Sequence, residues 1–251
     1  MENLKFDIQK AFETDDYLYF YSNILTKKRT KKEVDFLVRE LDLDKSLKIL
    51  DVACGFGRHS NALAKAGFNI TGVDISKGFL EIAANNAKKN RLNVNYICKD
   101  MRKIDFKNEF ERVYMLFTSF GYFNDGDNFK VLKNAAAAMK LGGLFCLEIL
   151  NKDSFIDTIL PFYVVEKGKD LMIDRNIFDG QTSRSLNRRI IIRDGVRKDK
   201  PFFIRLYNLA EIKDLLKKAG FAVYRVFSSY DSAPANNKSV RLLIIARKKE
   251  R

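Results

Sequence analysis

The stretch of residues 47–76, LKILDVACGFGRHSNALAKAGFNITGVDIS, constrains the fold of this chain more than any other part of the sequence. Residues 47–52 form a short apolar run typical of a strand buried inside a parallel sheet. Small residues and glycines follow at positions 53–57, and residues 58–65 have the apolar spacing of a helix. The segment therefore predicts a strand that leads through a glycine-bearing turn into a helix.

A second strand and an acidic residue complete this unit. Gly67 ends the helix as a C′ residue would, and residues 68–73 predict a strand that delivers Asp74 at its carboxyl end. Glycines before a helix let backbone N–H groups approach a ligand, and the helix dipole there favours a negative group. An acid after the second strand suits a ribose diol, so the unit predicts a nucleotide-cofactor site.

The turn itself separates two candidate cofactors. A dinucleotide fingerprint requires the pattern G-x-G-x-x-G, whereas this chain has Gly55 and Gly57 followed by Ser60 in the third position. The sequence is therefore a weak match to a nicotinamide-dependent reductase.

Further landmarks occur in a fixed order along most of the chain, and together they resemble the class I S-adenosylmethionine (SAM)-dependent methyltransferases. The landmarks are Asp51 with Cys54 and Gly55, the run Gly-Val-Asp-Ile-Ser at 72–76, Lys-Asp-Met-Arg at 99–102, the strand and loop at 113–122, Leu-Gly-Gly at 141–143 and Lys-Ala-Gly-Phe at 218–221.

The resemblance implies SAM as the cofactor and assigns residues to it. Asp74 would bind the ribose hydroxyls, Asp100 the adenine amine, and residues 53–57 the methionine part through their backbone. The complete set of implied cofactor residues is Asp51, Ala53, Cys54, Gly55, Gly57, Asp74, Ile75, Asp100, Met101 and Phe117.

The implied fold is α/β: a Rossmann-like, doubly wound sheet of seven mostly parallel strands in a single domain. Further strands are predicted at residues 93–98, 113–117, 144–150, 221–227 and 240–246, and helices at 33–43, 76–90, 127–139 and 208–219. We expect residues 1–46 to form a helical cap, 47–150 the cofactor-binding core, and 207–251 the end of the core sheet.

Residues 151–206 depart from the alternation of strands and helices. Four strand-like runs are joined by Asp-Gly pairs at 179–180 and 194–195, which are hairpin signals. Consecutive hairpins cannot be crossover units, so an antiparallel insertion between the fifth and sixth strands is predicted. We expect this insertion to act as a substrate lid.

Methyl transfer from a sulfonium is an in-line displacement with a good leaving group, so positioning can supply most of the catalysis. A general base is needed only for an acceptor that arrives protonated, and no residue is assigned a catalytic role. Tyr21, His59 and Tyr122 are the candidates for contact with the substrate.

Composition bounds the remaining possibilities. Cys54, Cys98 and Cys146 fall in or after predicted buried strands and lack metal-ligand spacing, which together with a single histidine argues against a metal site or disulfides. No apolar run approaches the ~20 residues that span a bilayer, and no secretory pattern precedes the core, so we expect a cytoplasmic protein. The net charge of +14 is distributed along the chain, which favours a solvated surface over an RNA-binding one.

These observations predict a methyltransferase that acts on N or O of a small molecule. One alternative is an RNA or protein methyltransferase of the same fold, which the net charge would assist. Another is a non-catalytic SAM-binding subunit that activates a partner. The sequence does not indicate the acceptor or the oligomeric state.

Overall fold

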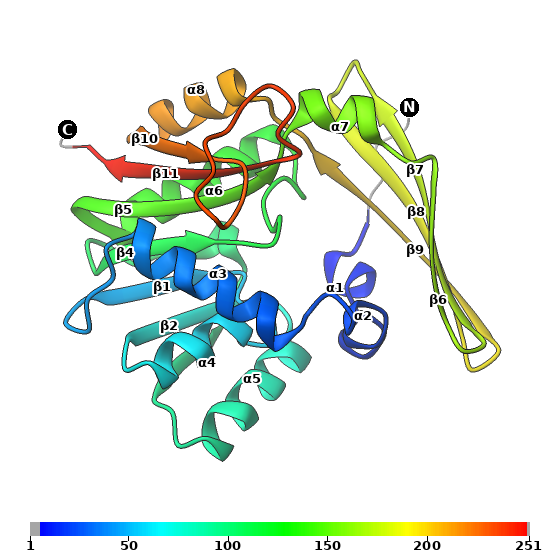
Figure 1. The fold of residues 1–251 in the computed structure, drawn as a ribbon, viewed down its shortest axis with the longest axis horizontal. Coiled ribbons are helices and arrows are strands. Elements are labelled where there is room, and N and C mark those ends of the chain that lie inside the picture. Colours follow the sequence, from blue (N-terminus) through cyan, green and yellow to red (C-terminus); the bar gives the residue numbers. More distant parts are fainter. Residues whose placement is uncertain (1–5, 250–251) are drawn as a thin grey trace.

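The computed structural model of the chain describes residues 6–249, and its centre is a seven-stranded sheet (Figure 1). The strands in spatial order are β10 (Phe221–Phe227), β11 (Arg241–Lys248), β5 (Met139–Leu150), β4 (Phe110–Met115), β1 (Lys48–Val52), β2 (Asn69–Asp74) and β3 (Val94–Cys98). Pairing is parallel from β5 to β3, while β11 runs antiparallel to both of its neighbours. The predicted doubly wound, mostly parallel sheet is confirmed.

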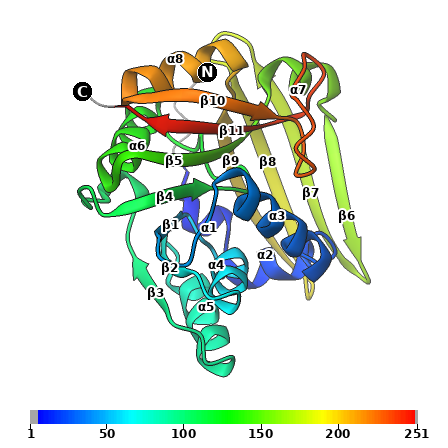
Figure 2. The ribbon, with the colours of Figure 1, turned by 60° about the vertical axis from the view of Figure 1, so that its left-hand side comes forward.

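Helices cover both faces of this sheet. On one face α3 (Lys27–Glu40) and α4 (Arg58–Lys65) enclose a core with β1, β4 and β11, and α5 (Lys77–Lys89) packs beside α4 on β2 and β3. On the other face α6 (Asp125–Ala138) and α8 (Leu209–Ala219) enclose the larger core (Figure 2). The strands between the two layers are apolar on both sides, as expected for a buried parallel sheet.

Side-chain caps fix the starts of the helices next to the sheet. The Ser76 hydroxyl accepts a hydrogen bond from the Phe79 N–H at the start of α5. Asn208 and Glu211 form a capping box at the start of α8, the helix that was predicted to begin at residue 208. A short 3₁₀ helix, η1 (Met101–Lys103), follows β3 and is capped by Asp100.

The insertion is an antiparallel sheet, as predicted. After α7 (Lys152–Thr158), its four strands follow in order: β6 (Phe162–Lys167), β7 (Asp170–Asp179), β8 (Arg184–Arg193) and β9 (Val196–Arg205). Asp194 and Gly195, with φ of 52° and 75°, form the predicted two-residue turn. The other Asp-Gly pair does not form a tight turn, because residues 180–183 make a four-residue loop and Ser183 takes the left-handed conformation.

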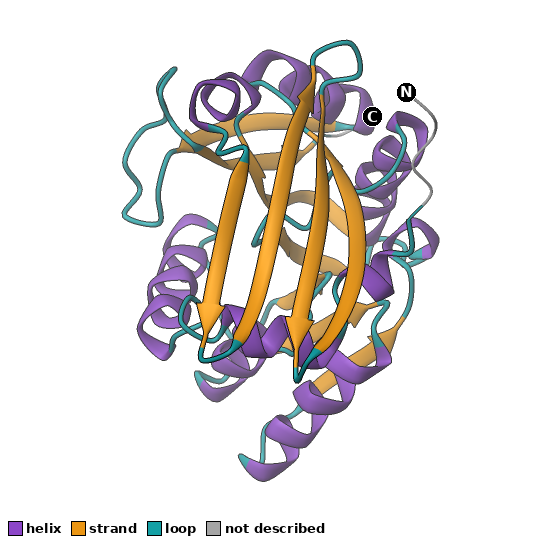
Figure 3. Ribbon diagram, turned by 90° about the vertical axis from the view of Figure 1, so that its right-hand side faces the viewer, coloured by secondary structure: helices purple, strands orange, loops and turns teal. Residues whose placement is uncertain are grey.

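Two short N-terminal helices fill the space between the two sheets (Figure 1). These are α1 (Ile8–Ala11) and α2 (Thr14–Tyr21). Phe20 of α2 packs on Met172 and Ile191 of the insertion, and the buried Asp16 carboxylate accepts from Lys200 Nζ at 2.7 Å. One face of the insertion's sheet therefore packs against α2. The opposite face of that sheet, turned to the viewer in Figure 3, carries no described helix.

Three further local predictions were wrong. Helix α3 starts at Lys27, because Thr26 caps it, so the basic run at 27–32 is helical instead of preceding the helix. Strand β4 ends at Met115, and Phe117 lies in the loop beyond it. Cys98 is exposed because β3 is an edge strand, whereas Cys54 and Cys146 are buried.

Residues 1–5 and 250–251 of the predicted cap and sheet end lie outside the described residues. Within the described part, no helix is long and apolar enough to cross a membrane. Over the same residues, no group of three His, Cys, Asp or Glu side chains is placed to hold a metal ion.

The junction between the core and the insertion generates a stability prediction. Gly121 has φ +110°, its carbonyl accepts from the Arg205 N–H at 2.8 Å, and a Cβ there would lie 2.6 Å from the Arg205 carbonyl oxygen. We expect Gly121→Ala to lower the free energy of unfolding by about 3 kcal/mol, through left-handed strain plus a backbone clash. Urea denaturation measures this change.

Gly142→Ala is the matched control. Gly142 also has a positive φ, +73°, but a Cβ would meet nothing within 4 Å. Its substitution should cost about 1 kcal/mol, from backbone strain alone. Equal losses in the two variants would contradict a tight contact between residue 121 and β9.

Candidate functional site

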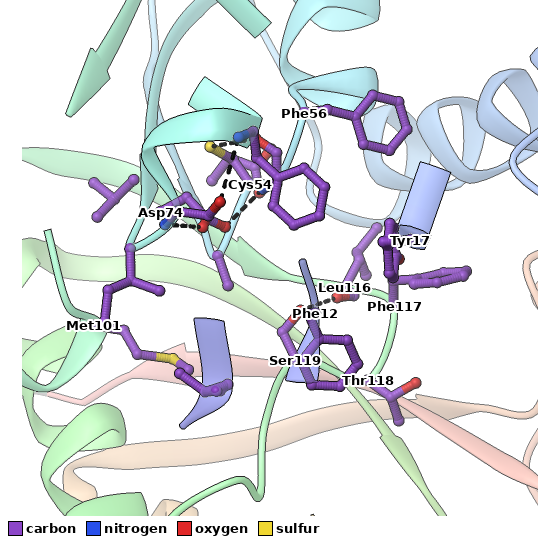
Figure 4. Close-up of a pocket in the computed structure, with 18 of the residues that line it drawn as sticks. Phe12, Tyr17, Cys54, Phe56, Asp74, Met101, Leu116, Phe117, Thr118 and Ser119 are labelled. Atoms are coloured by element: carbon purple, nitrogen blue, oxygen red, sulfur yellow. Dashed lines mark hydrogen bonds between the residues drawn. The ribbon is translucent and has the colours of Figure 1, made fainter. Parts of the chain in front are cut away.

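The carboxyl ends of β1, β2 and β4 meet at a pocket that residues of α1, α2 and α3 complete (Figure 4). Open α/β sheets bind their ligands at this edge. All the residues predicted from the sequence line the pocket except Gly57. Those that line it are Asp51, Ala53, Cys54, Gly55, Asp74, Ile75, Asp100, Met101 and Phe117 of the cofactor set, and Tyr21, His59 and Tyr122 of the substrate set.

Asp74 is the central polar group of the pocket. Its Oδ2 accepts from the Gly55 N–H and its Oδ1 from the Ser76 N–H, both at 2.8 Å. Burial raises the pKa of this carboxyl, and the two backbone hydrogen bonds oppose the rise. A carboxylate has about four lone-pair sites, so two remain for a pair of ligand hydroxyls.

The glycine-bearing loop, residues 53–57, lies next to Asp74 and is bonded to it through the Gly55 N–H. Its backbone is left-handed at Ala53, Gly55 and Gly57, with φ of 57°, 54° and 72°. Gly57 belongs to the loop but does not line the pocket. A Cβ there would be 2.2 Å from the Tyr96 hydroxyl oxygen, so no larger residue fits. Gly55, by contrast, has nothing within 4 Å of where a Cβ would lie, which leaves open space on the pocket side. The loop thus has room for a ligand to approach its backbone.

Asp51 supports this loop from below. Its buried carboxylate accepts from the Ser60 hydroxyl at 2.6 Å, so it anchors the start of α4 through a side chain. Burial raises the pKa of Asp51 to about 7, although the Ser60 hydrogen bond opposes the rise.

Met101 lies at the far end of the pocket from Phe117 (Figure 4), and its chain neighbour Asp100 also lines the pocket. Asp100 is already paired, because its Oδ2 accepts from Arg102 Nη2 at 2.6 Å. Burial would raise the pKa of Asp100, but the hydrogen bonds from Arg102 outweigh it and the pKa is lowered. A ligand amine that approaches Asp100 therefore meets a carboxylate that is ionised and held in place.

Aromatic side chains form the other end of the pocket. Tyr17 stacks on Tyr21 with ring centroids 4.6 Å apart, and Phe12 meets Tyr122 edge to face at 5.3 Å. Arg189 of β8 donates to the Tyr21 hydroxyl oxygen at 2.8 Å, which fixes the position of that ring. Burial raises the pKa of Tyr17, Tyr21 and Tyr122, so all three hydroxyls are neutral at pH 7.

The insertion acts on the pocket indirectly. Among the described residues, none of the strands β6–β9 lines the pocket, whereas α1 and α2 do. Phe202 of β9 instead packs against Phe12 and Tyr122 from outside. Whether the insertion works as a lid stays a prediction.

His59 is a buried member of a charged cluster and not a surface residue. Its Nε2 lies 2.8 Å from Glu33 Oε2, and Glu33, which is fully buried, also binds Arg29 and Arg58. Burial lowers the pKa of His59, so the ring is neutral at pH 7 despite the nearby Glu33. Burial opposes ionisation of Glu33, but hydrogen bonds from His59 and Arg58 lower its pKa.

The loop after β4, residues 116–119, also lines the pocket. Phe117 and Thr118 both take the left-handed conformation, with φ of 58°, which is uncommon for such residues and costs strain. The Phe117 N–H donates to the fully buried Glu148, and the guanidinium groups of Arg29 and Arg58 lie 4.9 and 5.0 Å from the centre of its ring. The loop is therefore held in place from both sides.

Sequence reasoning missed several lining residues, notably Phe12, Tyr17, Arg29, Arg58 and Arg241. Arg58 directly follows the glycine loop, which was an available signal. Arg29 lies in a run of basic residues and Arg241 begins the last strand, and neither position distinguishes them from surface cations.

Comparisons with known proteins agree with this geometry. The family model of the methyltransferase domain matches residues 49–143. A solved S-adenosylmethionine-dependent methyltransferase from Clostridium acetobutylicum superposes with a TM-score of 0.81 over 94% of this chain and 99% of that one, at 20% identity. The chain therefore contains a methyltransferase domain at residues 49–143 and has the fold of the SAM-dependent methyltransferases. It is thus an enzyme whose cofactor is SAM, and the reductase alternative is set aside.

Two curated relatives match part of this chain in sequence. A ubiquinone biosynthesis O-methyltransferase of Coxiella burnetii is 34% identical over 110 residues, 43% of this chain and 46% of the relative. A glycine/sarcosine N-methyltransferase of Halorhodospira halochloris is 30% identical over 163 residues, 60% of this chain and 61% of the relative. The chain therefore spans less than two thirds of either relative.

The raised pKa of Asp51 generates a prediction on pH and stability. Between about pH 4 and the folded-state pKa of about 7, the folded protein holds a proton on Asp51 that the unfolded chain has lost. The free energy of unfolding should therefore fall as the pH rises from about 5 to about 8. In Asp51→Asn this fall should be smaller by about 2 kcal/mol.

Urea denaturation at the two pH values measures the difference. Asp105→Asn is the control, because Asp105 is exposed and Lys99 lowers its pKa, so it titrates below this range in both states. An unchanged pH dependence in Asp51→Asn would contradict the burial of a protonated Asp51.

Proposed function

We propose that this methyltransferase transfers the methyl group of SAM to a nitrogen or oxygen of a small-molecule acceptor. The observation that carries the proposal is the two-ended pocket. One end is formed by residues 53–55, Asp74 and Asp100, and the other by aromatic side chains that α1 and α2 hold over it. An acceptor covered by these helices must be small.

We infer the cofactor contacts from the same geometry. Asp74 has lone-pair sites left for the two ribose hydroxyls, and the open space at Gly55 suits the methionine part. Asp100 and Met101 would hold the adenine, with Arg102 keeping the Asp100 carboxylate in place. These assignments follow the general rule that an acid after the second strand binds ribose.

The pocket residues contribute to catalysis by positioning the acceptor next to the cofactor. When bound, SAM supplies a methyl group on a sulfonium, which leaves readily. Orientation of the acceptor can then supply as much as about 7–11 kcal/mol of the barrier reduction. Tyr17, Tyr21 and Tyr122 present neutral hydroxyls that can orient an amine or hydroxyl, and His59 is already bound to Glu33. We assign none of them as a general base.

The names of the two relatives are consistent with either oxygen or nitrogen as the acceptor atom. One is by name an O-methyltransferase of ubiquinone biosynthesis, and the other a glycine/sarcosine N-methyltransferase. Both names indicate small acceptors, in agreement with the covered pocket, whereas the net charge of +14 is the one feature that favours RNA.

A radiolabel transfer assay tests the proposal. Purified protein is incubated with methyl-labelled SAM and either a panel of small amines, amino acids and phenols, or total RNA. We expect label in a small molecule and little retention on heparin at physiological salt. Label in RNA alone would contradict the proposal, and SAM binding without product on any acceptor would indicate a partner-activating subunit.

Tyr122→Phe adds a control for the position of the acceptor. Removal of this hydroxyl should raise KM for the acceptor several-fold and leave SAM affinity unchanged, because Tyr122 lies at the aromatic end of the pocket. An effect on SAM affinity alone would place the acceptor elsewhere.

A further inference from the structure

Strand β6 is an exposed, apolar edge of the insertion's sheet. It pairs with β7 on one side, and no strand of residues 6–249 lies on its other side, where it is the outermost strand in Figure 2. It begins Phe-Tyr-Val-Val, and Phe162, Tyr163 and Val164 are 63%, 45% and 53% exposed. The unpaired N–H and C=O groups of such an edge can pair with a strand of another chain.

The other edge of the same sheet is protected against such pairing. Strand β9 contains Pro201 and also Arg197 and Asp199, whose side chains are 61% and 63% exposed. Charges and proline are the residues that keep edge strands from joining another chain. Strand β6 has no proline, pairs with β7 in unbroken register, and is charged only at its last two residues. The contrast indicates that β6 is the edge that takes a partner.

The pairing with β7 determines which backbone groups of β6 are free. The Asn176 N–H donates to the Pro161 carbonyl at 2.9 Å, and hydrogen-bonded pairs alternate along an antiparallel ladder. Every second residue from Pro161 therefore bonds to β7. The residues between them, Phe162, Val164 and Glu166, direct their N–H and C=O groups toward the free edge.

These free groups select one register for two identical strands. In an antiparallel pair related by a twofold axis, all three residues are used only when Val164 lies opposite the partner's Val164. Phe162 then lies opposite the partner's Glu166. Each hydrogen-bonded pair exchanges two bonds, so the three pairs give about six backbone hydrogen bonds. A parallel arrangement would instead place Glu166 beside the partner's Glu166, and adjacent like charges are unfavourable.

Two unpaired charges complement each other in this register. Glu166 and Arg175 are exposed on the same face of the sheet, and neither forms an ion pair within the part of the chain that the structure describes. In one copy they are four residues apart along the strands, about 14 Å. Across the twofold axis they lie two strand spacings apart, about 10 Å between backbones, which two long side chains span. The Arg175 guanidinium already lies 5.9 Å from the Phe162 ring centre, on the way to the free edge.

We propose that a second copy of this chain binds at β6, so that the two four-stranded insertion sheets join across a twofold axis into one continuous antiparallel sheet. In this dimer Glu166 of each copy pairs with Arg175 of the other. The arrangement is closed, because each copy uses the same strand, and it gives both edges a partner. The inference concerns a surface outside the pocket and is independent of the methyl acceptor.

Sedimentation equilibrium of the purified full chain measures the oligomeric state. We expect a species of twice the chain mass of 29.0 kDa. The contact is short for a protein interface, so its dissociation constant should lie in the micromolar range. A protein that stays monomeric at about 100 μM would overturn the proposal.

Val164→Pro tests the edge itself. The substitution removes an N–H that faces the free edge and none that bonds to β7, so the sheet should persist while the dimer weakens at least about tenfold. Ile177→Lys is the matched control, because Ile177 is 52% exposed on the same face but belongs to the inner strand β7. It should leave the dimer unchanged. Dissociation by Ile177→Lys and not by Val164→Pro would mean that the copies pack face to face, and would overturn the proposal.

A charge exchange tests the register without altering the backbone. Glu166→Arg and Arg175→Glu each place like charges next to each other across the axis and should weaken the dimer several-fold. The double variant restores opposite charges and should recover the dimer, which a merely structural role of either side chain would not explain. Failure of the double variant to recover it would contradict this pairing. Retained binding of S-adenosylhomocysteine shows that each variant is folded.

Discussion

The pocket depends on the hydrogen bonds that the Asp74 carboxylate accepts from the N–H groups of Gly55 and Ser76. These bonds join three elements: the end of β2, the loop after β1 and the start of α5. Because the loop is left-handed at Ala53, Gly55 and Gly57, it needs such a partner to hold its shape. A side chain at the end of one strand thus sets the conformation of the loop after the neighbouring strand, and with it one wall of the pocket.

The parts of the fold with strong local signals could be predicted from the sequence. The strand, glycine loop and helix of residues 48–65 are specified by adjacent residues, as are the Ser76 and Asn208 caps and the Asp194–Gly195 turn. The resemblance then placed Asp74, Asp100 and Phe117 on one pocket, because their positions at strand ends are fixed by the topology.

The charged clusters that line the pocket could not be predicted, since their contacts join residues far apart in the chain. Arg241 binds Glu148 across neighbouring strands, and Arg29 and His59 meet at Glu33. Nothing in the sequence marks Glu33 or Glu148 as fully buried, because burial of a charge is decided by tertiary packing. For the same reason, the insertion was expected over the substrate, whereas its contacts with the pocket pass through α1 and α2.

Calorimetric titration of the wild type and Asp74→Ala with S-adenosylhomocysteine and NADH tests the central role of Asp74 most directly. The account predicts micromolar binding of S-adenosylhomocysteine and none of NADH to the wild type. In Asp74→Ala the affinity should fall at least about tenfold, through lost ribose hydrogen bonds and a loosened loop, while the protein stays folded. Unchanged affinity in a folded Asp74→Ala, or binding of NADH alone, would contradict the account.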